Sequence, residues 1–236
     1  GEKSIRIPVQ RRNPEELAAR MRGFWLRPTQ KDVGIRTPLH ELMYLEPERS
    51  DLRDLDDHLA EIGLTVDDFL NAAATDEFGA LEASMDELRR ITGEMKARLL
   101  VPLLVEELLD TGSKIVLMCW HHPVMEYLVD KLARFNPVVV NGRTTHAAAD
   151  QAQRCFSEDD DCKVFIGQIV ACGEAIDLSS ASELIFVESS FTPKDMKQAA
   201  LRITNHNQTK WPRVRVATLE GTMDEPLQGS VVRRVA

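Results

Sequence analysis

Two consecutive runs decide the fold: Glu183-Leu-Ile-Phe-Val-Glu188 and Phe191-Thr-Pro-Lys-Asp-Met-Lys-Gln-Ala-Ala-Leu-Arg-Ile-Thr-Asn-His-Asn-Gln208. The first run predicts a strand, because it is apolar and too short for a helix. The second run predicts a helix that begins soon after the strand ends. Its spacing places Gln198, Arg202 and Asn205 on one face, since positions i, i+4 and i+7 of a helix are neighbours.

The same alternation of strand and helix recurs through residues 111–236. Short apolar runs predict strands, and amphipathic patterns between them predict helices. The predicted strands are residues 114–119, 138–140, 162–167, 183–188 and 214–219. Continuous apolar strands separated by helices indicate an α/β fold with a mostly parallel sheet covered on both faces.

Residues 51–110 predict helices only. Their longest amphipathic pattern runs from 81 to 108, and we expect interruptions at Thr92-Gly93 and at Pro102. The segment contains 16 Asp and Glu but only 5 Lys and Arg, in a chain of net charge −9. Such charge usually forms a solvated helix face, and a docking surface for a partner or another lobe is the alternative. Because the acidity is confined to this segment, the overall charge does not exclude nucleic-acid binding.

Composition excludes several classes of protein. The 236 residues suffice for one sizeable domain, with or without a helical appendage. No apolar run approaches the roughly 20 residues of a membrane helix, so we expect no membrane partner. The four cysteines lack CxxC spacing, which predicts buried reduced thiols in a cytoplasmic protein and no metal site.

The sequence lacks the motifs with which one chain holds ATP. It contains no GxxxxGK[ST] phosphate loop, no DExH or DExD box and no Gly-rich dinucleotide fingerprint. We therefore expect this segment alone to be inactive as an ATP hydrolase. An unrelated small-molecule-binding α/β domain would need a polar pocket on this lobe, and no motif indicates one.

Six short motifs occur in a characteristic order. They are Arg89 to Lys96, Trp120-His121-His122 after a strand, Asn141 to Thr145, Cys172 to Ser182, Gln198 to Gln208 and Gly221 to Glu225. In this order they resemble the second motor lobe of superfamily-two helicases, in the form of the switch/sucrose-nonfermenting DNA translocases. Residues 20–47 resemble the segment after the first motor lobe of that family, so the resemblance covers most of the chain.

The resemblance implies a RecA-like three-layer αβα lobe with an acidic helical segment. It divides the chain into an interlobe segment at 1–50, an acidic helical insertion at 51–95 and the C-terminal lobe at 96–236. It implies a translocase or helicase that uses ATP and Mg²⁺, both bound mainly by an N-terminal lobe of the same protein. The implied partners are that lobe and double-stranded DNA, and the implied location is DNA-associated.

The resemblance also assigns residues to the nucleotide. Gln198 and Arg202 match motif positions that face ATP, whereas Asn205 stands where a second arginine belongs. The further nucleotide-binding positions are Gly173, Glu174 and Asp177. Asparagine offers a neutral amide in place of a planar cationic fork. Either the lobe has lost its arginine finger and is a DNA- or protein-docking module, or Arg202 acts alone.

For DNA, the resemblance implies contacts along the phosphates. The candidate positions are His121, His122, Arg143, Thr144 and Thr145. Each has an ordinary alternative. The two histidines at a strand end are placed to cap the following helix, and the two threonines form a common N-cap signal.

Overall fold

Six strands form one sheet in which every neighbouring pair is parallel. The computed structural model describes residues 34–63, 65, 67–68, 71, 82–173, 176–190 and 192–235. The strands are β1 (Leu39–Leu45), β2 (Ile115–Cys119), β3 (Val138–Val140), β4 (Val164–Gln168), β5 (Glu183–Phe186) and β6 (Arg213–Leu219), in the order β1-β6-β5-β2-β4-β3. The predicted α/β fold with a parallel sheet is confirmed.

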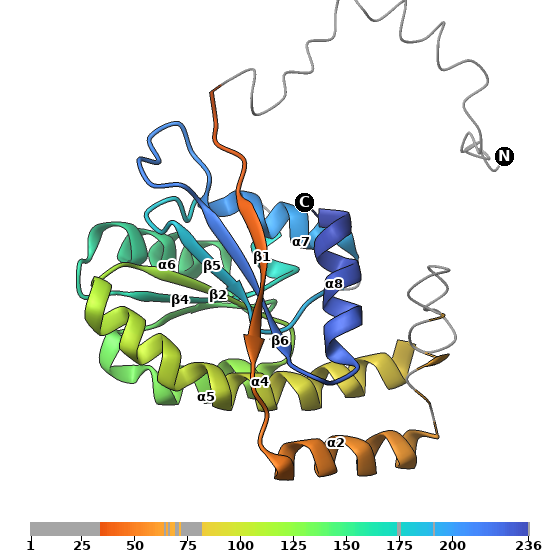
Figure 1. Ribbon diagram of the computed structural model, residues 1–236. Helices are drawn as coiled ribbons and strands as arrows, with labels where there is room; N and C mark the ends of the chain where they lie inside the picture. The colour runs from red at the N-terminus through yellow and green to blue at the C-terminus, as the bar shows by residue number, and fades with distance from the viewer. Residues whose placement is uncertain are drawn as a thin grey trace, which may run out of the picture. The chain divides into compact units, whose positions relative to one another are not determined.

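Helices cover both faces of this sheet (Figure 1). On one face lie α2 (Arg49–Ile62), α4 (Glu82–Thr111) and α5 (His122–Lys131), and on the other lie α6 (His146–Glu158) and α7 (Pro193–Ala200). The last helix, α8 (Asp224–Val235), contributes Leu227 to one core and Val231 to the other. Single 3-10 turns occur at η2 (Ala133–Phe135), η3 (Ala171–Gly173) and η4 (Leu201–Ile203).

The alternation of side chains along each strand produces two cores. In β2, Ile115 and Leu117 belong to the core under α4 and α5, whereas Val116 and Met118 belong to the core under α6 and α7. All five β2 residues are buried. A strand buried on both faces must be apolar throughout, which is why its sequence shows no polar alternation.

Helix α4 is continuous, contrary to the interruptions predicted at Thr92-Gly93 and Pro102. The Thr92 hydroxyl donates to the Leu88 carbonyl oxygen at 2.9 Å, a bond that is compatible with the helix. A proline inside a helix costs about 3 kcal/mol. The buried leucines on either side of it offset this cost by packing onto the sheet, and they are Leu100, Leu104 and Leu108.

The sheet of the lobe begins earlier in the chain than residue 96. Residues Arg36–Ala236 form one compact unit, and β1 pairs with β6 from Leu39 opposite Arg213 to Leu45 opposite Leu219. Helix α4 also runs across the boundary predicted between 95 and 96. The division into three segments remains a prediction, and its first 33 residues lie outside the described part of the chain.

A buried ion pair joins α4 to the start of α8. Lys96 and Asp224 are 2% and 3% exposed, and the Lys96 Nζ lies 2.7 Å from the Asp224 Oδ2. Asp224 also accepts hydrogen bonds from the Leu219 backbone N–H and from the Gln228 side chain. The pair tolerates burial because both charges are compensated and hydrogen-bonded. Among the described helices, none is long and apolar enough to cross a membrane.

Candidate functional site

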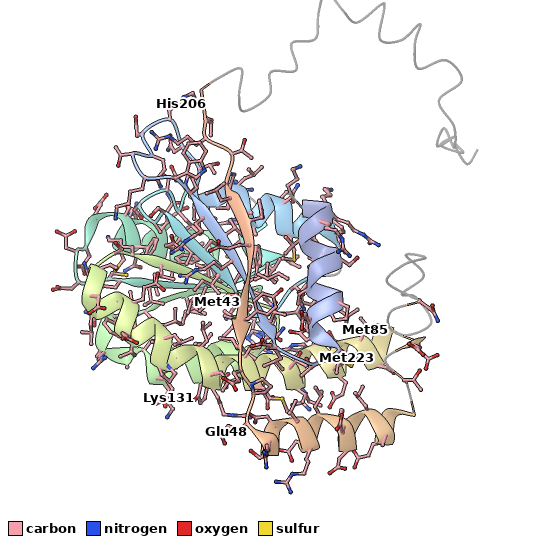
Figure 2. The ribbon with its side chains drawn as sticks, in the orientation of Figure 1. Met43, Glu48, Met85, Lys131, His206 and Met223 are labelled. Atoms are coloured by element: carbon pink, nitrogen blue, oxygen red, sulfur yellow. The ribbon has the colours of Figure 1, made fainter. Side chains whose placement is uncertain are left out.

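Because all six strands are parallel, the loops that follow them emerge at one edge of the sheet. Met223 and Glu48, which follow β6 and β1, mark this carboxyl edge in Figure 2. His206, in the loop that precedes β6, lies at the opposite, amino edge. The motifs that follow β2 and β3 therefore begin at the carboxyl edge.

The buried carboxylate of Glu188 organises the loop after β2. Its Oε2 accepts hydrogen bonds from the backbone N–H groups of Trp120 and His121, at 2.7 and 2.9 Å. Its Oε1 lies 2.5 Å from the His121 Nδ1. Glu188 is 1% exposed, so these contacts replace the water that its charge would otherwise require.

The His121 ring lies between two carboxylates. Its Nδ1 faces Glu188, and its Nε2 lies 3.3 Å from the Asp86 Oδ2 on α4. Burial lowers the pKa of His121, but the hydrogen bonds and charges of Glu188 and Asp86 outweigh that effect and raise the pKa above its ordinary value. The Arg89 guanidinium stacks over the Trp120 ring at 4.3 Å, next to the same site. Helix α4 is thus joined to the strand end by charge as well as by apolar packing.

Gly93 permits the close approach of α4 to Glu188. A Cβ at this position would lie 2.7 Å from the Glu188 Cγ and Oε1 atoms. Atoms do not approach that closely in folded proteins without a shift of the neighbours. Since Glu188 is held by three bonds, the glycine is required by contact and not by backbone conformation.

These contacts change the interpretation of the His121-His122 motif. His121 occupies the N-cap position of α5, but its side chain makes no capping hydrogen bond. Both ring nitrogens face carboxylates, which leaves neither directed at a phosphate. His122 is half-buried in the first turn of α5. In this structure His121 anchors the strand end to α4 and does not cap α5, and its contact with DNA stays a prediction.

The loop after β3 is built by short-range hydrogen bonds. Thr145 caps α6, because its hydroxyl oxygen accepts a bond from the Ala148 backbone N–H, as the N-cap alternative predicts. The Thr144 hydroxyl oxygen accepts a bond from the Asn141 backbone N–H at 2.9 Å. Arg143 and Thr145 are both exposed. Their side chains are accessible for a ligand, whereas Thr144 mainly shapes the turn.

Gln168 connects this loop to the loop after β2. Its Oε1 accepts a bond from the Gly142 backbone N–H, and its Nε2 donates to the Trp120 carbonyl oxygen, both at 2.9 Å. Two segments that the sequence assigns to DNA are thereby held together by a side chain at the end of β4. Their relative position is defined by the sheet order, which places β4 between β2 and β3.

The predicted helix face of Gln198, Arg202 and Asn205 is wrong in its geometry. Helix α7 ends at Ala200, Arg202 lies in the 3-10 turn η4, and Asn205 follows that turn. The turn η4, which follows the end of α7, is stabilised by Gln208, whose Nε2 donates to the Ile203 carbonyl oxygen. Gln198 is exposed on α7, so the three residues do not form a single helical row.

Asp177 and Asn205 are nevertheless brought into contact. The Asn205 Nδ2 donates to the Asp177 Oδ2 at 3.0 Å. The Asp177 backbone N–H donates to the Gln153 Oε1, and the Arg202 carbonyl oxygen accepts from the Leu178 N–H. These bonds position two predicted nucleotide residues next to the turn that carries Arg202.

Arg202 is partly buried near the Cys172 thiol. Burial raises the pKa of Cys172 to about 12, and the charge of Arg202 opposes that rise. Gly173 ends the turn η3 directly after Cys172, and Glu174 lies outside the described residues. No group of three or more His, Cys, Asp or Glu among the described residues could hold a metal ion.

Sequence reasoning missed the residues that hold these loops in place. They are Asp86, Gln153, Gln168 and Glu188. A weak signal existed for Glu188, since a carboxylate directly after an apolar strand must find buried partners. No local signal identifies Asp86, because its partner His121 lies 35 positions away in the chain.

Comparison with known proteins supports the class that the fold indicates. Residues 95–207 match the family "Helicase conserved C-terminal domain". The chain is 25% identical over 168 residues to a Drosophila melanogaster protein, "SWI/SNF-related matrix-associated actin-dependent regulator of chromatin subfamily A-like protein 1". It is 27% identical over 132 residues to "DNA repair protein RAD5A" of Arabidopsis thaliana. These matches cover 70% and 55% of the chain but only 22% and 13% of the relatives.

Solved structures share the fold at lower identity. The Sulfolobus solfataricus SWI2/SNF2 ATPase C-terminal domain superposes with a TM-score of 0.61 at 14% identity, covering 83% of this chain and 85% of that one. The S. solfataricus SWI2/SNF2 ATPase core in complex with dsDNA gives 0.60 at 20% identity, covering 89% and 48%. The C-terminal part of the Fun30 ATPase domain gives 0.60 at 14% identity, covering 84% and 90%.

The fold and the ordered motifs are similar to those of a helicase conserved C-terminal domain, whose family model matches residues 95–207. The relatives and solved structures that the chain resembles include proteins of the SWI/SNF and SWI2/SNF2 type.

Substitution of Gly93 tests the contact with Glu188. Gly→Ala inside a helix normally stabilises by about 1 kcal/mol. We expect Gly93→Ala to lower the free energy of unfolding instead, by about 1–3 kcal/mol, because the new methyl group displaces Glu188. Gly229→Ala in α8 is the matched control, since its nearest neighbour is the Arg233 Nη1 at 4.0 Å. Urea denaturation measures both, and equal stabilisation by the two substitutions contradicts the prediction.

The raised pKa of His121 predicts a pH-dependent stability. A group whose pKa is raised by folding stabilises fully below its unfolded pKa of about 6.5, and this contribution is lost as pH rises through the folded pKa. His121→Gln should therefore destabilise the protein more at pH 5.5 than at pH 8.5. Urea denaturation at the two pH values measures the difference, with His146→Gln at an exposed position of α6 as control. An equal loss of unfolding free energy at both pH values would contradict a stabilising contact between a charged His121 and the carboxylates of Glu188 and Asp86.

Proposed function

We propose that this lobe is the second half of an ATP-driven DNA translocase or helicase. In this proposal a first RecA-like lobe of the same protein holds ATP and Mg²⁺, and this lobe closes on them. The observation that supports it most is the family match over residues 95–207, which includes the Gln198-to-Asn205 run and the Asp177–Asn205 contact. Because the chain spans only 22% and 13% of its relatives, the activity of the whole protein is part of the proposal.

Arg202 is the cation that we assign to the transferring phosphoryl group. A preorganised guanidinium stabilises the charge that develops there in the transition state. Gln198, which like Arg202 follows β5 in the chain, is exposed and supplies a neutral hydrogen-bonding group. The Asn205 side-chain amide donates to Asp177. This position therefore contacts Asp177 although it carries no arginine. Gly173, Glu174 and Asp177 complete the proposed nucleotide-binding set.

The loop after β3 is the proposed contact with the DNA backbone. Arg143 and Thr145 are exposed and offer a cation and a hydroxyl, which are common donors to phosphate oxygens. Thr144 shapes the loop, and His122 begins α5 two residues after Trp120, whose carbonyl oxygen Gln168 joins to this loop. His121 acts in this proposal by positioning the neighbouring loop through Glu188. One solved relative with this fold, a SWI2/SNF2 ATPase core, was determined in complex with dsDNA.

A second candidate function is that of a degenerate docking lobe. The observation that favours it is the neutral Asn205, whose side-chain amide is already bonded to Asp177. In this alternative the lobe binds DNA or protein, and no hydrolysis takes place at Arg202.

Hydrolysis by the longer protein separates the two functions. In a protein that joins this lobe to a first motor lobe, we expect DNA-stimulated ATP hydrolysis, and Arg202→Ala should reduce it by about 10³-fold or more. The isolated chain should show no turnover with or without DNA. Steady-state phosphate release measures both, with Arg134→Ala at an exposed position of η2 as control.

Two results would decide against the main proposal. Turnover by the isolated chain rules out a shared site, and a normal rate in Arg202→Ala removes Arg202 from it. Absence of hydrolysis in the complete wild-type protein, with DNA binding retained, supports the docking lobe.

The DNA contact is tested on this chain alone. Arg143→Gln should weaken binding to a short duplex similarly for unrelated sequences, because a phosphate contact carries no base information. The slope of log affinity against log salt should fall in magnitude by about 0.9, the value for one phosphate. Arg134→Gln is the charge-matched control. Equal affinities and slopes for Arg143→Gln and the control would exclude this loop from the interface.

A further inference from the structure

A polar cavity of about 420 Å³ lies at the amino edge of the sheet, away from the loops after β2 and β3. It opens between the segments that precede β2, β4, β5 and β6. The lining residues that matter are Lys114, Lys163, Lys210, Ser179, Ser180 and Ser182. Its volume lies within the range of ligand pockets, but its lining is far more polar than usual.

Three lysines line this cavity, and their ammonium groups bond to neutral oxygens and not to a carboxylate. Lys114 donates to the carbonyl oxygens of Phe156 and Asp159, Lys163 to that of Gly112, and Lys210 to the Ser113 hydroxyl. None of the three forms an ion pair with a described Asp or Glu. The acid in the lining is the exposed Asp160. Three neighbouring lysines without an ion pair among the described residues are unexpected in a chain with 38 acids and 29 bases.

Hydroxyl groups and a fixed loop complete the cavity. The turn that carries Ser179 and Ser180 is held by Gln208, whose Nε2 donates to the carbonyl oxygens of Ser179 and Ala181 at 2.9 Å. Gln208 belongs to the loop that carries Lys210, and its Oε1 accepts from the Lys210 backbone N–H. One side chain therefore connects the serine turn and the lysine loop, so the site exists before a ligand arrives.

We propose that this cavity binds a phosphate group. A tetrahedral oxyanion presents acceptors in several directions, which suits separate lysine and serine donors better than it suits a bidentate fork. Lys114 and Lys163 are half-buried, where a charge interacts more strongly than in bulk water. The lining includes none of the residues proposed to bind nucleotide or DNA, although the Ser179 backbone N–H donates to Asp177. The proposal therefore does not depend on the proposed function. The phosphate belongs to a small phosphoanion or to a nucleic-acid backbone, and the test separates these sources.

Calorimetric titration of this chain with inorganic phosphate, at constant ionic strength, tests the site. Lys163→Gln combined with Lys210→Gln should weaken phosphate binding by about tenfold or more, since two charged donors are lost. Lys131→Gln is the matched control, because its side chain lies on α5, far from the loop of His206 that continues to Lys210 (Figure 2). Thermal denaturation verifies that the double variant folds.

A second titration uses a short DNA duplex with the same variants. Lysine-dependent binding of inorganic phosphate identifies a small phosphoanion as the ligand. Lysine-dependent binding of the duplex, without binding of inorganic phosphate, identifies the nucleic-acid backbone. The proposal is overturned if neither probe binds, or if the double variant binds both probes as tightly as Lys131→Gln. Unchanged binding by the double variant leaves Arg202 and Arg143 untouched, whereas a duplex that does not bind at all also contradicts the contact proposed for Arg143.

Discussion

The carboxylate of Glu188 is the charge on which the arrangement at the carboxyl edge depends. It is buried at the end of the β5 segment, and its oxygens accept bonds from the loop after β2. A buried charge must be fully bonded or it destabilises the fold. Glu188 therefore dictates the path of Trp120 and His121, contributes to the raised pKa of His121 and requires the absence of a side chain at Gly93. Helix α4 packs where it does because all three conditions hold together.

Two further polar contacts join parts of the lobe near the ends of strands. Lys96 and Asp224 join α4 to α8, and Gln168 joins the loops after β2 and β3. Apolar packing alone allows small sliding of helices on the sheet, whereas bonded polar groups select one position. The lobe consequently presents its motif loops in a defined geometry, as the proposed closure on a second lobe would require.

Local chemistry predicted much of this structure. The apolar runs between 114 and 219 revealed their strands as parallel-sheet strands, because a strand covered on both faces has no polar alternation. The N-cap role of Thr145 could be predicted because its partner, Ala148, lies only three residues further along the chain. The continuity of α4 and the end of α7 at Ala200 were not predicted. Helix α4 continues because the packing of Leu100 and Leu104 offsets the cost of Pro102. The turn after α7 is bonded to Gln208, a contact that helical spacing does not reveal.

The sequence by itself determined the class of fold, the order of the motifs and the residues that each motif offers, since these follow from contacts between near neighbours in the chain. Only the tertiary structure decided which of those side chains are bonded within the protein and which are exposed to bind a ligand. It committed His121 to Asp86 and Glu188, paired Asn205 with Asp177 and left Arg143 exposed. It also gathered Lys114, Lys163 and Lys210 around one cavity. Such groupings join residues tens of positions apart, and the stacking of parallel strands, not local spacing, brings them together.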